Sequence, residues 1–226
     1  MRYLLVAAIL VLGTCSLHAQ GSYSLGMMPV LNLNHKYENG WRLNLKLESR
    51  QRFLQGEFQN EGEADYEYVL TDLAALGAKK VGLSSTLAGG YLIRFRDHGF
   101  VHRLIQQYSV VQEPRGLRLV HRIVTDQTFQ ENSTPELRLR YRFTLELPLS
   151  GQTVNPGEAY FKINHEYLNA LEADIYGLEV RWIPLLGFLF TDTNKLEGGV
   201  DYRLDDFLEG PGRNRFWVNV AWYVAF

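Results

Sequence analysis

The segment from Trp41 to Phe53 reads WRLNLKLESRQRF, and its apolar and polar residues alternate almost without a break. Leu43, Leu45 and Leu47 lie at odd positions, whereas every even position from 42 to 52 carries a charged or amide side chain. Successive side chains of a β-strand point to opposite faces. The segment therefore predicts a strand with one mainly apolar face and one charged face. As a helix, the same residues would scatter charge on all sides.

The alternation recurs along the chain. From Leu137 to Leu147, arginines at 138, 140 and 142 alternate with leucine, tyrosine and phenylalanine. Noisier versions of the pattern occupy residues 31–34, 91–96, 117–129, 161–167, 196–204 and 216–226. Residues 68–81 are ambiguous, because Leu70, Leu73 and Ala74 could equally lie on a helix. The sequence predicts an all-β chain, with repetition at the level of hairpins.

Turn signals separate these runs and fall into two kinds. Three are short, at 38–40, 113–116 and 191–194, and three are longer and polar, at 56–64, 130–135 and 205–214. Short turns that alternate with longer loops are typical of outer-membrane barrels. The runs number about eleven, but bacterial barrels of this kind have even strand numbers. We therefore expect a closed antiparallel transmembrane β-barrel of 10 or 12 strands.

The N-terminus predicts export. Arg2 precedes an apolar run from Leu4 to Leu12, and Leu17-His18-Ala19 fits the cleavage site of a signal peptide. We expect a signal peptide over residues 1–19 and a barrel over residues 20–226. The run is too short for a membrane anchor. Cys15, the only cysteine, lies within the signal, so the mature chain has no disulfide or thiolate metal site. Thr14 before Cys15 fits a lipoprotein cleavage site poorly.

The charged faces distinguish a membrane barrel from a soluble one. Arginine dominates over lysine there, and its planar guanidinium suits crowded ion-pair networks. A narrow lumen explains this choice, and the apolar faces would then meet outer-membrane lipid. A soluble β-sandwich or a lipocalin-like barrel remains the alternative. The predicted lumen network, a structural feature, comprises Arg42, Glu48, Arg50, Arg94, Arg103, Arg122, Asp126, Arg138, Arg140, Arg142, Glu166, Glu179, Arg181, Glu197, Asp201 and Arg203.

The C-terminus ends on an aromatic residue. Trp222, Val224 and Phe226 share one face of the last predicted strand. Outer-membrane proteins commonly end in this way, and their assembly machinery reads the terminal strand. We expect these three residues to form the C-terminal assembly signal, with the barrel-assembly machinery as a partner.

The order of several short motifs resembles a known family. These are His-Arg-Leu-Ile-Gln-Gln (102–107), His-Arg-Ile-Val-Thr-Asp-Gln-Thr-Phe (121–129), Asn-His-Glu-Tyr-Leu (164–168) and Lys-Leu-Glu-Gly-Gly-Val-Asp-Tyr-Arg (195–203). The chain resembles the domain of unknown function 2490 family, small outer-membrane barrels of Gram-negative bacteria of the Bacteroidetes type. The resemblance covers nearly the whole mature chain. It implies a fold and a location in the cell outer membrane, and it implies no catalytic residues.

We expect a non-enzymatic structural or interaction protein with a charge-filled lumen. A narrow channel for small, anionic solutes is one alternative, and an outer-membrane lipid hydrolase or protease is another. No mature histidine is followed two places later by serine, and Asp205-Asp206 lies in an acidic loop that water would solvate. The histidines lack metal-ligand spacing, so we expect no metal and no cofactor. No basic block suggests nucleic acid. The sequence does not indicate an oligomeric state.

Overall fold

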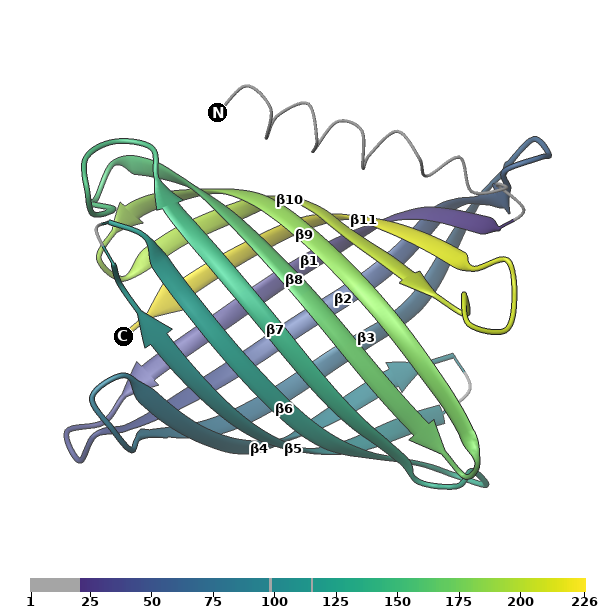
Figure 1. Cartoon of the computed structure of the whole chain (residues 1–226), viewed down its shortest axis with the longest axis horizontal. Coiled ribbons are helices and arrows are strands. Elements are labelled where there is room, and N and C mark those ends of the chain that lie inside the picture. Colours follow the sequence, from purple (N-terminus) through teal and green to yellow (C-terminus); the bar gives the residue numbers. More distant parts are fainter. Residues whose placement is uncertain (1–20, 98, 115) are drawn as a thin grey trace, which may run out of the picture.

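Eleven β-strands form a closed barrel in the computed structural model, which describes residues 21–97, 99–114 and 116–226 (Figure 1). The predicted signal peptide lies outside the described residues. The strands are β1 (Ser22–Lys36), β2 (Trp41–Glu57), β3 (Glu63–Lys80), β4 (Ser85–Arg96), β5 (Gly99–Gln112), β6 (Arg118–Gln130), β7 (Glu136–Pro148), β8 (Glu158–Glu172), β9 (Ile175–Thr191), β10 (Asn194–Asp205) and β11 (Arg213–Ala225).

Each strand pairs antiparallel with the next, and β1 closes the barrel by pairing parallel with β11. The parallel register runs from Ser22 opposite Arg213 to Asn34 opposite Ala225. The prediction of 10 or 12 strands is therefore wrong, as is a fully antiparallel sheet. Each hairpin reverses the chain, so an odd number of strands makes the first and last run in the same direction. Their long parallel ladder still pairs the backbone at the seam.

The ambiguous stretch over residues 68–81 is not a helix. Glu63–Lys80 forms β3, which pairs with β2 and β4 along most of its length. The period-two pattern is weak there because Leu70, Ala74 and Leu76 face the interior while Leu73 faces outward. Both faces of β3 are thus apolar in their central part, which removes the contrast that marks the other strands.

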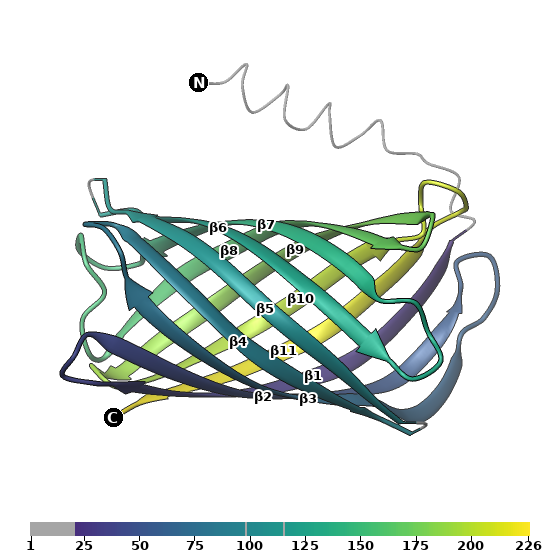
Figure 2. The same ribbon diagram turned by 90° about the horizontal axis from the view of Figure 1, so that it is seen from below.

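The three short turns all lie at the end of the barrel that carries the C-terminus, and the three longer loops lie at the opposite end (Figures 1 and 2). Not every connection follows this division into short turns at one end and long loops at the other. The nine-residue loop 149–157 lies at the C-terminal end, and the two-residue turn 173–174 lies at the other. In that turn Ala173 has a φ of 51°, a left-handed conformation that usually favours glycine.

Strand glycines allow large side chains to lie flat against the inner wall. Gly187 on β9 lies beneath the ring of Tyr160, and a Cβ there would overlap that ring. Gly198 on β10, by contrast, has its nearest neighbour, the Asn219 carbonyl oxygen, at 4.0 Å from a Cβ position. A glycine within a strand thus marks close packing at Gly187 and not at Gly198.

Candidate functional site

The barrel interior gathers the charged side chains. Fourteen of the sixteen residues predicted for the lumen network line one internal cavity of about 680 Å³. The other two, Asp126 and Glu197, have fully buried carboxylates that lie against cations of that lining. Period-two alternation brings these residues together because every second side chain of a closed barrel points inward.

Asp126 is the centre of the first cluster. Its carboxylate lies 2.6 Å from Arg138 Nε, 2.7 Å from Arg140 Nη2 and 3.3 Å from Arg103 Nε. Arg103 Nε also donates to Thr128 Oγ1 at 3.0 Å. One carboxylate from β6 thus holds three guanidinium groups from β5 and β7, which fixes all three against the inner wall.

A second set of ion pairs runs around the barrel from β7 to β11. Glu166 accepts from Arg142 at 2.6 Å and lies 2.8 Å from Arg181. Arg181 also pairs with Glu179, and Glu179 lies 3.0 Å from Arg215. Arg215 also pairs with Asp205, and Asp205 pairs in turn with Arg213 at 2.8 Å. The alternation of sign along this series gives each buried charge an opposite partner, on the same strand or on one nearby, which offsets its desolvation.

Three smaller groups complete the network. Arg94 on β4 and Asp72 on β3 form a bidentate pair with two bonds of 2.7 Å. Arg203 and Asp201, two positions apart on β10, pair at 2.7 and 2.9 Å. On β2, Glu48 lies between Lys46 and Arg50. The paired side chains of each group come from one strand or from adjacent strands.

Glu197 anchors the interior toward the C-terminal end. It accepts from Lys162 at 2.7 and 2.9 Å, from Lys195 at 3.1 Å and from the Tyr160 hydroxyl at 2.7 Å. Tyr160 reaches this carboxylate because its ring lies on Gly187. Lys195 also lies over the ring of Tyr223, 4.7 Å from its centroid. Three polar or charged groups are therefore fixed around one buried acid.

The sixteen predicted residues leave out seven charged side chains that belong to the ion pairs described above: Lys46, Asp72, Lys162, Lys195, Asp205, Arg213 and Arg215. Asp72 lies in the stretch 68–81, where the sequence pattern fits a strand and a helix equally well. Asp205 is the first residue of the predicted polar loop 205–214, and Arg215 lies between that loop and the last predicted strand, which begins at Phe216. Their positions follow the inward phase of β10 and β11, so extending the alternation by one step on each strand would have found them.

Positive charge exceeds negative charge in this interior. Fifteen arginine and lysine side chains line the cavity, against six aspartates and glutamates. Asp126, Glu197 and Asp205 add three buried carboxylates. Among the described residues, Arg42 and Arg122 of this lining lie within 4.0 Å of no carboxylate. The cations that do pair often share one acid, which accounts for the surplus.

The three C-terminal residues lie on the outer face of the closing seam. Trp222 donates through Nε1 to Asn194 Oδ1 at 2.6 Å. The Phe226 amide donates to the Asn34 carbonyl at 3.0 Å, and its ring packs on His35 with centroids 5.2 Å apart. These contacts tie the chain end to β1 and β10. Their role as an assembly signal stays a prediction.

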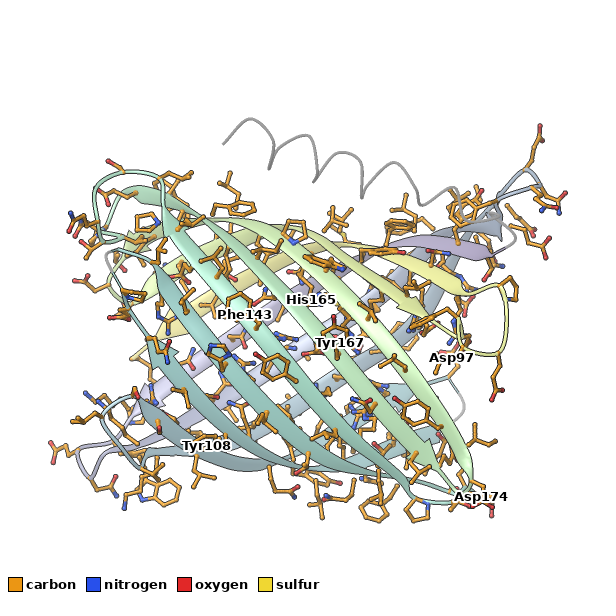
Figure 3. All side chains as sticks on the ribbon, viewed as in Figure 1. Asp97, Tyr108, Phe143, His165, Tyr167 and Asp174 are labelled. Carbon is orange, nitrogen blue, oxygen red and sulfur yellow. The ribbon has the colours of Figure 1, made fainter. Side chains whose placement is uncertain are left out.

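The outer face carries histidines beside aromatic rings. His121 Nδ1 and the Tyr141 hydroxyl are 2.8 Å apart, and His165 packs on Trp182 with ring centroids 4.0 Å apart. Figure 3 shows Phe143, His165 and Tyr167 close together on β7 and β8. Over the described ranges, no group of three or more histidine, cysteine, aspartate or glutamate residues could hold a metal ion. No helix within those ranges is long and apolar enough to cross a membrane.

Comparison with known families gives one match. The family model described as "Protein of unknown function (DUF2490)" matches residues 29–215, which covers most of the barrel. The chain belongs to this family. The DUF2490 match begins within β1 and ends within β11, so it includes every strand between them and the whole ion-pair network. Neither the curated proteins nor the solved structures gave a match.

Proposed function

We propose that the protein is an integral β-barrel of the bacterial outer membrane, with a lumen closed by its ion-pair network. In this proposal it is a structural or interaction protein and not an enzyme. A cleaved signal peptide directs its export, and the barrel-assembly machinery inserts it among outer-membrane lipids.

One observation carries this proposal: the inside and outside of the barrel are reversed relative to a soluble protein. Leucine, valine and aromatic side chains are exposed on the outer face of every strand, as with Leu47, Leu73, Leu139, Val218 and Trp222. The carboxylates of Asp126, Glu166 and Glu197 are buried inside. A lipocalin-like barrel would bury the apolar set and expose the charged set. Lipid, in which a closed barrel satisfies every backbone group, accommodates the observed arrangement.

Cell fractionation tests the location. The mature chain should sediment with outer membranes, resist carbonate extraction and migrate faster on gels when it is not heated. Each result follows from a barrel that is held in lipid by its outer face and stabilised by a closed hydrogen-bonded sheet. Recovery of the folded protein as a soluble periplasmic species would contradict the proposal.

The surplus of lumen cations favours a second candidate, a narrow pathway for small anions. Small barrels of this size leave little open bore. In planar bilayers the filled lumen predicts no steady conductance from the purified protein. The anion pathway predicts small steps whose reversal potential in a salt gradient shows anion selectivity. Large, steady, unselective conductance would exclude both the filled lumen and the narrow pathway.

A further inference from the structure

Arg122 is the cation of the lumen whose surroundings are least compensated. It projects from β6 into the cavity, directly opposite Arg142 on β7 and Ser109 on β5. Like charges at directly opposed positions of adjacent strands repel each other. Within the described part of the chain, no carboxylate lies within 4.0 Å of Arg122, and its buried Nε has no hydrogen-bond partner.

Arg142 and Arg140 stand beside it on the same inner wall. Arg142 donates a hydrogen bond through Nε to Glu166, and Arg140 donates one through Nη2 to Asp126. Arg140 Nε is buried and has no hydrogen-bond partner either. Both side chains retain a partly exposed surface toward the cavity, with 23% and 18% of the side chain accessible. Three guanidinium groups therefore share one stretch of wall, with two buried donors left unused.

Neutral polar groups line the cavity together with the arginines. Gln107 and Ser109 on β5 and Asn164 on β8 line the same cavity. The nearby carboxylates Asp126 and Glu166 already bind two or three cations each, so they offer little to Arg122. A buried guanidinium without a partner is costly, and a bound anion removes that cost while it relieves the repulsion between Arg122 and Arg142.

We infer that Arg122, Arg140 and Arg142 form a binding site for a small oxyanion inside the barrel. The planar fork of arginine matches the paired oxygens of phosphate, sulfate and carboxylate, whereas a spherical chloride ion can use only its charge. The cavity of about 680 Å³ has room for such an ion with its remaining water. The inference rests on the proposed function only in taking the charged face as the inner wall of the barrel; an ion has to enter the cavity from one end and does not have to pass through.

Calorimetric titration of the refolded full-length mature chain in detergent tests the site. Inorganic phosphate, sulfate, acetate and chloride are added separately at constant ionic strength. The unmodified protein should bind at least one of the three oxyanions more tightly than chloride. Arg122→Gln should weaken that binding about tenfold or more, the usual result of losing a charge-assisted bond. Arg122→Lys should give an intermediate affinity, since it keeps the charge and loses the fork.

Arg118→Gln is the matched control, because Arg118 also lines the cavity but lies at its rim near Glu113 and Glu146. It should leave oxyanion affinity unchanged. In unfolding experiments phosphate should stabilise the unmodified chain and not Arg122→Gln, and without phosphate Arg122→Gln should be no less stable than the unmodified chain. Heat-modifiable migration checks that each variant is folded.

Three outcomes would overturn the inference: no oxyanion binding by the unmodified protein, equal affinity for chloride, or equal loss in Arg122→Gln and Arg118→Gln. None of these would affect the membrane location, which fractionation tests separately. A soluble periplasmic location would in turn leave the titration result standing. The two proposals can therefore fail independently.

Discussion

At the scale of single residues, the central feature is that a few buried carboxylates hold many cations. Asp126 has a fully buried carboxylate and three arginine partners. Breaking a buried pair by removing one partner leaves an uncompensated charge, which costs far more than losing an exposed pair. Removing Asp126 would leave Arg103 and Arg140 without a carboxylate within 4.0 Å in the described part of the chain, and Arg138 with Glu136 alone, at 3.8 Å.

Asp126→Ala should therefore destabilise the folded barrel by about 3–5 kcal/mol. The measurement is equilibrium urea unfolding of the protein in lipid vesicles. Glu113→Ala provides the control, because Glu113 also faces an arginine, at 3.5 Å, but its side chain is 68% exposed. That change should cost less than about 1 kcal/mol. Similar costs for the two variants would show that the interior is too wet for the pairing to matter.

Sequence alternation predicted which side chains point inward, but it did not predict which of them form ion pairs with one another. The alternation does not say which acid each of the arginines at 138, 140 and 142 contacts. Arg142 pairs with Glu166, farther along the chain. Arg138 instead lies directly opposite Asp126, and Arg140 reaches the same carboxylate from the diagonal position. Pairing depends on strand register and side-chain reach, neither of which is visible in a period-two pattern.

At the scale of elements, strands were predictable where their two faces differ in polarity. β2 and β7 alternate leucine with charge and are evident from sequence. β3 is not, because its interior positions pack in an apolar cluster that includes Ala74, Leu92, Ile105 and Val124. The turn 173–174 was equally hidden, since Ala173 takes a left-handed conformation without the glycine that usually marks it.

The two faces of β5 provide a test of the assigned phase. Leu104 points outward with 46% of its surface exposed, and Gln107 lines the cavity. Leu104→Arg should cost about 2–4 kcal/mol in lipid vesicles, as for a cation on the lipid face near the bilayer centre. Gln107→Glu also introduces one charge on the same strand, but it faces a cation-rich lumen and should be tolerated. A reversed order of the two costs would mean that the faces are assigned the wrong way round.

At the scale of the whole molecule, two features define the protein: the sheet is closed, and its charged face points inward while its apolar face points outward. The parallel seam between β1 and β11 removes both free edges of an odd-numbered sheet. Bacterial barrels usually have even strand numbers, but backbone pairing does not require this. The eleven alternating runs in the sequence therefore predicted the strand number better than the even-number rule did. Closure places charged residues from ten strands around one cavity, while the apolar faces form a continuous outer surface.

Two tryptophans should differ in their contact with lipid. Trp182 lies on the outer face of β9 and is 46% exposed, whereas Trp217 lies on the inner face of β11 and is 3% exposed. Variants that keep only one of these tryptophans, with phenylalanine at the other tryptophan positions, can be reconstituted in vesicles of brominated phospholipid. The bromine atoms should quench Trp182 fluorescence strongly and leave Trp217 nearly unchanged. Unquenched Trp182, or equal quenching of both residues, would contradict a barrel with its apolar face in lipid and its charges inside.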